Sequence, residues 1–173
     1  PLEAVPITVL PQPELDLKLK RQCSPSANCP QPVFWVEEIR VYKRYARDAL
    51  QCKYELRPGL NILWADPRPG GKELYERGVQ GHAAGKTTFC RLLRYLVGEP
   101  AYGTKGFQQA VVNWEPNAIV VGKIWLDGQS WIVCRPLGLD KQEFAFPSGD
   151  IEDAFSSPAD AKKYSEFCDL LAD

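Results

Sequence analysis

Alternating apolar and polar positions in the first third of the chain predict two short β-strands, at residues 36–42 and 51–56. Every second residue of the later segment is apolar, from Cys52 to Leu56, so these side chains share one face of a sheet. A mostly apolar run at 60–65 follows a Pro-Gly turn and predicts a buried strand. The first part of the chain is therefore expected to be strand-rich.

The apolar spacing becomes helical in the middle of the chain. Phe89, Leu92, Leu93 and Leu96 recur every three or four positions, which predicts an amphipathic helix of about three turns that ends at Gly98.

The second half of the chain contains the strongest hairpin signal. Two apolar runs, 118–126 and 130–135, are joined by Asp127-Gly128, a dipeptide typical of tight hairpin turns. Helices are expected on either side, at 107–114 and at 159–171.

Residues 1–32 contain seven of the fifteen prolines and little periodicity, so they are predicted to form an extended arm or linker. One globular domain is expected over 33–173. No apolar run approaches the ~18 residues that cross a membrane, so no membrane contact is expected. The chain has no methionine, even at position 1, which favours a piece of a longer protein.

Charge and cysteine content leave the partner open. The net charge is −1, with −6 on the segment from residue 140 onward, so a strongly basic nucleic-acid-binding face is not indicated. The six cysteines form no C-x-x-C pair, which disfavours a zinc site and favours a reduced, cytoplasmic protein. Cys90 and Cys134 lie in apolar patterns and are expected to be buried.

One segment before the predicted central helix is interpreted as a phosphate-binding P-loop, although three residues separate its two glycines and the consensus G-x-x-x-x-G-K-[ST] has four. Glycines at both ends let consecutive backbone N–H groups face one anion, and the helix that follows adds its dipole. The competing interpretation is a surface turn beside a solvated lysine. The motif consists of Gly81, His82, Ala83, Ala84, Gly85, Lys86, Thr87 and Thr88.

The pattern of two strands, the segment Pro58-Gly59-Leu60-Asn61-Ile62-Leu63, a P-loop and an amphipathic helix resembles the opening of ABC-type ATPase heads of SMC and RecN- or RecF-like proteins. In those heads an I-x-N-F-[RK] motif comes first. Here Ile39-Arg40-Val41-Tyr42-Lys43 stands at a matching distance, with Val41 in place of Asn. The resemblance implies an α/β P-loop NTPase fold: an ABC-ATPase-like N-terminal lobe with a mixed sheet, antiparallel β-hairpins and a P-loop helix.

The resemblance also implies roles for the motif residues. Residues 81–85 would wrap the phosphates of ATP, and Lys86 would bind the β- and γ-phosphates. Thr87 would hold Mg²⁺, and Thr88 would contact the α-phosphate. Lys86 and Thr87 are thereby the candidate catalytic residues, and ATP and Mg²⁺ the expected cofactors.

Three further residues are weaker candidates. Lys43 and Arg44 are candidates for contacts with the nucleotide. The favoured interpretation is that both are solvated charges at the edge of a strand. His82 is expected to be a spectator, although its neutral form could donate to a phosphate.

The chain departs from the family pattern in two ways. An insertion at 66–80 separates the predicted strand from the P-loop. The sequence has no L-S-G-G-Q-like signature and no apolar run followed by Asp-Glu. Ile124-Trp125-Leu126-Asp127 imitates a Walker B ending, but Gly128 follows, and a hairpin turn explains it better. Gln142 is the nearest Q-loop candidate and is expected to be a surface residue.

The leading hypothesis is an ATP-binding lobe of an SMC/RecN-like head in DNA maintenance or anti-phage defence. A second lobe or partner head would supply the Walker B and signature motifs, and DNA would be contacted through the assembly. The alternative is a nucleotide-gated protein-interaction module without its own turnover. A small P-loop kinase or GTPase is less favoured, because the N-K-x-D motif of GTPases is absent.

Overall fold

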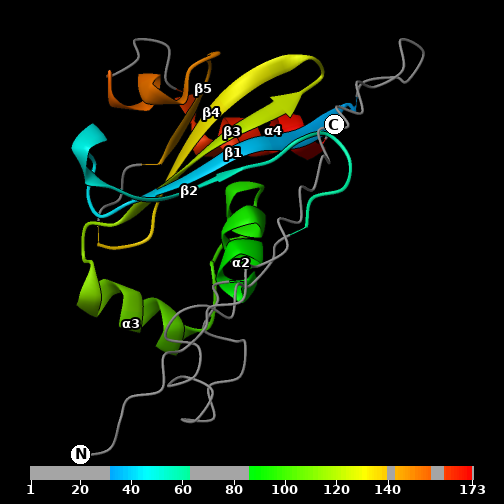
Figure 1. Cartoon of the computed structure of the whole chain (residues 1–173). Coiled ribbons are helices and arrows are strands. Elements are labelled where there is room, and N and C mark those ends of the chain that lie inside the picture. The colour runs from blue at the N-terminus through cyan, green and yellow to red at the C-terminus, as the bar shows by residue number, and fades with distance from the viewer. Residues whose placement is uncertain (1–31, 63–85, 140–142, 157–161, 173) are drawn as a thin grey trace, which may run out of the picture. The chain divides into compact units, whose positions relative to one another are not determined.

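A computed structural model describes residues 32–62, 86–139, 143–156 and 162–172 of the chain, which Figure 1 shows in colour. The chain divides into two units, Pro1–Gln31 and Pro32–Asp173. All the described residues belong to the second unit.

The second unit contains one sheet with the strand order β2-β1-β3-β4-β5-β6, and every neighbouring pair is antiparallel. The strands are β1 (Phe34–Tyr42), β2 (Leu50–Glu55), β3 (Ile119–Leu126), β4 (Gln129–Pro136), β5 (Phe144–Pro147) and β6 (Lys162–Lys163). The helices are α2 (Lys86–Leu96), α3 (Lys105–Trp114) and α4 (Tyr164–Ala172), with short 3-10 helices η1 (Arg47–Ala49) and η3 (Ile151–Phe155).

The predicted hairpin is confirmed as β3 and β4. Asp127 and Gly128 form its two-residue turn with φ angles of 49° and 76°. Two successive positive φ values match the right-handed twist of the flanking strands, and Asp and Gly tolerate this left-handed conformation. The strands then pair in register from Leu126 opposite Gln129 onward.

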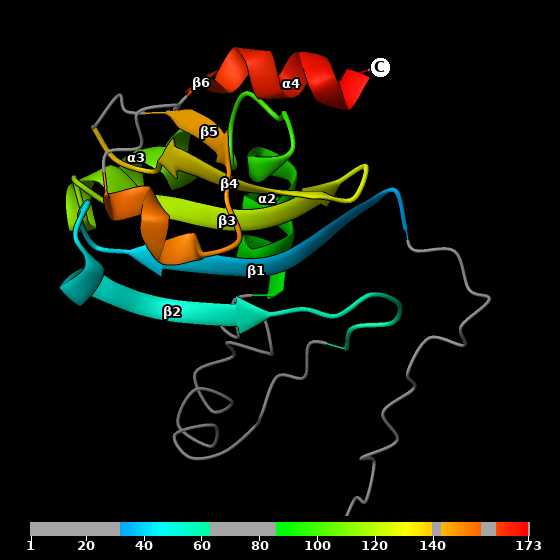
Figure 2. The same ribbon diagram turned by 90° about the horizontal axis from the view of Figure 1, so that it is seen from above.

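The two central strands are buried on both faces. Val120 and Ile124 of β3 pack in the core beneath α2 and α4, whereas Ile119 and Val121 pack in the core beneath η3. Figure 2 shows α2 and η3 on opposite sides of the sheet. Each side of β3 therefore meets apolar side chains, which explains why its sequence is a continuous apolar run.

Two predicted helices are confirmed, α2 with residues in the core and α3 with partly buried residues against it. α2 buries Phe89, Leu92 and Leu96 against the sheet, and the chain reverses at Gly98, whose φ is 119°. α3 covers the predicted 107–114 and begins two residues earlier, after the N-cap Thr104. The last helix starts at Tyr164 instead of residue 159.

The C-terminal end of α2 is held by one buried arginine from β4. The Arg135 guanidinium carbon lies 3.6 Å from the ring centroid of Tyr95 and 4.1 Å from that of Tyr164. Its Nη1 donates to the carbonyl oxygens of Tyr95 and Glu99, at 2.5 and 2.7 Å. The Tyr164 hydroxyl donates to the Tyr95 and Leu96 carbonyls. These donors satisfy carbonyls that a helix end leaves without intrahelical partners.

Among the described strands β2 stands at one edge of the sheet, and it carries charged side chains. Lys53 lies in the middle of this strand, with its Nζ 3.2 Å from Glu38 of β1 and 2.5 Å from Glu55. The opposite side of β2 bears Cys52 and Tyr54, which are half-buried, as the alternation predicted.

The predicted fold class is wrong. A mixed sheet requires parallel pairs, and within the described part of the chain all five strand pairs are antiparallel. The physical reason is topological. After the connection that includes α2 and α3, the chain enters β3, which lies beside β1 and runs in the opposite direction to it. The described residues thus form an antiparallel α+β arrangement and not the lobe of a P-loop NTPase.

Two further predictions were wrong: the buried strand expected at 60–65 and the burial of Cys90. Leu60 and Ile62 are 75% and 76% exposed and belong to no strand, while residues 63–65 lie outside the described part. Cys90 is exposed because it falls on the outer face of α2, whereas Cys134 is fully buried as predicted.

Candidate functional site

The last three residues of the P-loop motif form the first turn of α2. Lys86 and Thr87 are exposed there, Thr88 is half-buried, and no acidic residue is present in this turn. A helix N-terminus attracts anions through its free N–H groups and its dipole. Residues 81–85 of the motif, with His82, lie outside the described residues, as does the 66–80 insertion.

The two candidates that follow β1 differ in their position. Lys43 Nζ lies 3.6 Å from Glu115 Oε1 at the end of α3 and borders the same groove as Thr88. Arg44 pairs instead with Asp48 at 2.7 Å, with 60% of its own side chain exposed, and does not line this groove. The structure therefore brings Lys43 to the groove but not Arg44.

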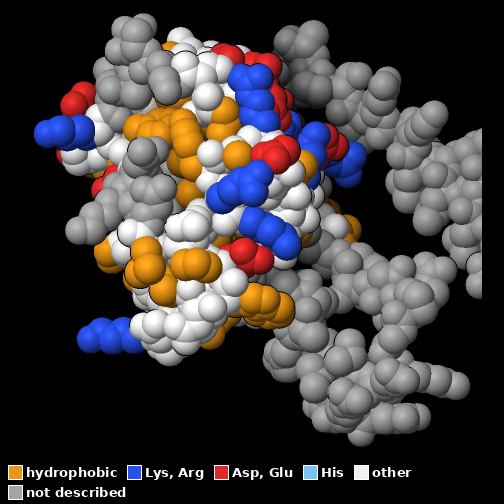
Figure 3. All heavy atoms as spheres, turned by 90° about the vertical axis from the view of Figure 1, so that its left-hand side faces the viewer, with side chains coloured by type: hydrophobic (Ala, Val, Ile, Leu, Met, Phe, Trp, Pro, Cys, Tyr) orange, Lys and Arg blue, Asp and Glu red, His pale blue; other side chains and the backbone are white. Residues whose placement is uncertain are grey.

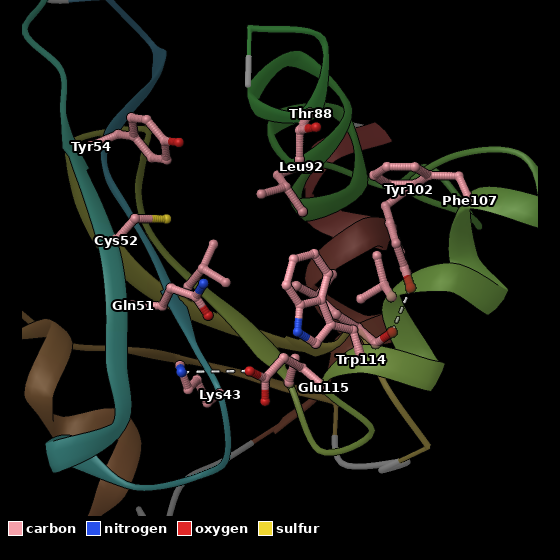
Figure 4. Close-up of a pocket in the computed structure, with 14 residues that line it drawn as sticks. Lys43, Gln51, Cys52, Tyr54, Thr88, Leu92, Tyr102, Phe107, Trp114 and Glu115 are labelled. Atoms are coloured by element: carbon pink, nitrogen blue, oxygen red, sulfur yellow. Dashed lines mark hydrogen bonds and ion pairs between the residues drawn. The ribbon is translucent and has the colours of Figure 1, made fainter. Parts of the chain in front are cut away.

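A groove of about 290 Å³ lies between the β1–β2 edge of the sheet and helices α2 and α3. Figure 4 shows Thr88 and Leu92 on one wall, with Tyr54 of β2 on the opposite wall. The spacing of Phe107, Val111 and Trp114 places them on one face of α3, which closes the groove from a third side.

Aromatic side chains supply much of this lining. Trp114 is 85% exposed and its indole lies at the groove, as Figure 4 shows. Tyr102 packs edge-on against Phe107, and Tyr54 packs edge-on against Phe89 of α2. In Figure 3, hydrophobic side chains are visible in both the upper and the lower part of this face, and the lower ones lie at the level of α3 in Figure 1. An exposed tryptophan beside an apolar hollow is a feature of ligand and partner sites.

A few polar groups stand among these rings. The Gln51 side chain points into the groove, and the Lys43–Glu115 ion pair lies at the end away from Thr88 (Figure 4). Burial raises the pKa of Tyr54, and it raises the pKa of Tyr102 to about 12. Both hydroxyls therefore stay protonated at neutral pH, and that of Tyr102 donates to the Leu137 carbonyl.

The sequence did not point to Gln51, Trp114 or Glu115 as site residues. They come from two segments that meet only when the sheet edge packs near α3. The single local signal was Trp114 itself, a large aromatic residue at the end of a short polar helix.

The other chemical candidates do not assemble into a site. Asp127 of the Walker B-like sequence is exposed and occupies the β3–β4 turn. Among the residues that the structure describes, no group of three or more His, Cys, Asp or Glu side chains could hold a metal ion. Gln142 and the cysteines at 23 and 29 lie outside those residues.

These observations define an antiparallel α+β domain with an aromatic groove between its sheet edge and two helices. Comparisons with protein-family models, with curated proteins and with solved structures found no match to this chain. In the described part of the chain, none of the helices has the length and apolar character needed to cross a membrane.

Proposed function

We propose that this chain binds ATP with Mg²⁺ at the N-terminal end of α2. One observation supports the proposal most directly. The sequence G-x-x-x-G-K-T, which has one residue fewer between its glycines than the P-loop consensus, runs into a helix, so that Lys86, Thr87 and Thr88 form the first turn of α2. In this arrangement the backbone N–H groups and the Lys86 ammonium are available to one polyanion, and the Thr87 hydroxyl to Mg²⁺.

The charge around this helix end supports the same proposal. The first turn of α2 contains no acidic residue that would repel phosphate. Lys86 and Thr87 are both exposed, so neither has to leave a packed position to meet a ligand.

Replacing Lys86 by alanine is expected to weaken ATP binding about 10- to 100-fold, since a charge-assisted contact contributes about 1.5–3 kcal/mol. Isothermal titration calorimetry with MgATP measures this change. Lys105→Ala is the matched control, because Lys105 is also an exposed lysine at the first position of a helix. Unchanged affinity in Lys86→Ala would refute the proposal.

We further propose that the isolated chain binds ATP without hydrolysing it. Hydrolysis requires a carboxylate that holds the metal and a group that positions water. The one Walker B-like sequence supplies Asp127, which is used in a hairpin turn. Hydrolysis would therefore need a partner protein that supplies these groups. Otherwise ATP would gate a protein contact.

Phosphate release by the wild-type chain is therefore expected to equal the background release by the Lys86→Ala variant. A colorimetric phosphate assay with MgATP in excess measures both rates. Hydrolysis by the wild type that disappears in Lys86→Ala would show that the chain carries its own catalytic groups, and the version without turnover would then be abandoned.

We also infer that the protein works in the cytoplasm, where ATP and Mg²⁺ are abundant. Three cysteines in the described ranges, at positions 52, 90 and 168, are free thiols, as a reducing compartment favours.

A further inference from the structure

We propose that the groove between β2, α2 and α3 binds the adenine and ribose of the nucleotide, with Trp114 as the surface on which the base stacks. This inference rests on the proposed ATP binding and extends it to the other half of the ligand. The residues that line the groove all belong to the described part of the chain, and none of them comes from 81–85.

The groove begins at the place where the phosphates would end. Thr88, the last residue of the P-loop motif, lines it, and so does Leu92, one helical turn further along α2. A nucleotide held by its phosphates at the start of α2 therefore has this hollow within reach of its nucleoside. The volume of about 290 Å³ is close to the lower end of the range for small-molecule pockets, about 300–1,000 Å³, which suits a ligand of this size.

The lining suits a flat heteroaromatic ring. Trp114, a residue that is 85% exposed, has its indole at the groove, and Phe107 and Tyr54 lie on other sides of the hollow (Figure 4). Any nucleobase can stack on such rings, because each base has a π-face. Removal of one stacking ring measurably weakens binding of the nucleotide. An exposed tryptophan is unfavourable in water, so a ligand that covers it gains hydrophobic free energy.

The polar groups suit the edge of the base and the ribose hydroxyls. Gln51 has an amide that both donates and accepts, and it points into the groove. The Lys43–Glu115 ion pair closes the far end, and its Glu115 carboxylate is an acceptor for an exocyclic amine or a hydroxyl. Few and localised polar groups within an apolar lining are the usual composition of a small-ligand pocket.

Calorimetry with two probes, MgATP and magnesium tripolyphosphate, separates this inference from the proposed function. We expect Trp114→Ala to weaken MgATP binding about five- to tenfold and to leave tripolyphosphate binding unchanged, with Trp114→Phe close to wild type. Leu139→Ala is the matched control, since Leu139 is a 67% exposed apolar residue outside the groove. Circular dichroism confirms that each variant is folded.

The outcomes are distinct. If Trp114→Ala binds MgATP as tightly as the wild type, or loses both probes equally, the groove does not hold the base and the inference fails while phosphate binding stands. If the wild type binds neither probe, the proposed function fails and the inference with it. Photolabelling with 8-azido-ATP gives a second readout. Labelled peptides from 51–54 or 107–115 support the inference, and labels found only elsewhere contradict it.

Discussion

Replacing Arg135 by methionine is expected to lower the free energy of unfolding by about 3 kcal/mol. The guanidinium lies between the rings of Tyr95 and Tyr164 and donates to two carbonyls at the end of α2. Methionine has nearly the same length but no donor and no charge. The Glu99 carbonyl would lose the hydrogen bond from Arg135, and both cation–π contacts would disappear.

Urea unfolding followed by tryptophan fluorescence measures this loss. Arg44→Met is the matched control, because Arg44 is a largely exposed arginine in an (i, i+4) ion pair, and such a pair contributes less than about 0.5 kcal/mol. A variant Arg135→Met as stable as the wild type would mean that α2 is held by its apolar contacts and needs no anchor at its C-terminal end.

Replacing Gly138 by alanine is expected to lower the free energy of unfolding by about 3 kcal/mol or more. A Cβ atom added at this position would lie 1.9 Å from the Pro116 carbonyl oxygen and 2.4 Å from its carbon. These are backbone atoms, so no side-chain rotation relieves the overlap. The close approach brings Leu139 N within 2.6 Å of the Pro116 oxygen, and this hydrogen bond joins the end of β4 to the segment before β3.

Thermal unfolding compares this variant with Gly149→Ala, which adds the same methyl group in open space and should change stability by less than about 0.5 kcal/mol. A shift in Gly138→Ala as small as that of the control would show that the two segments separate easily. The contact would then play no part in the stability of the β3–β4 core.

Elements with strong local signals were predicted correctly from the sequence. The Asp127-Gly128 turn fixes the hairpin because both residues accept positive φ values, whatever surrounds them. α2 was predicted from an apolar stripe of the right period, and its Gly98 ends it. In each case the information lies within a few residues, so no tertiary contact was needed.

The sheet itself could not be predicted from such signals. β5 has four residues and β6 has two, and η3 covers the second face from a segment with little periodicity. Pairing of β1 with β3 joins residues about 80 positions apart, for example Ile39 and Gly122. The resemblance to ATPase heads assumed parallel neighbours, and the direction of a distant strand is not encoded in its own apolar pattern.

The candidate site was predicted only in part. Lys86, Thr87 and Thr88 were identified from a motif with a chemical meaning, and they stand at the start of a helix as expected. The groove beside them was missed because its walls come from three separated segments. Trp114 was the one local signal, and no other residue type in these segments indicates a hollow before they are packed together.

The charges on β2 also bear on how copies of the protein meet at high concentration. An unpaired edge strand offers free N–H and C=O groups to any other extended chain, which is a route to fibrous association. Adding a strand from another molecule along β2 would bring its backbone against Lys53 and Glu55 and strip water from both charges. We therefore expect these two charges to disfavour pairing of β2 with a strand from another copy.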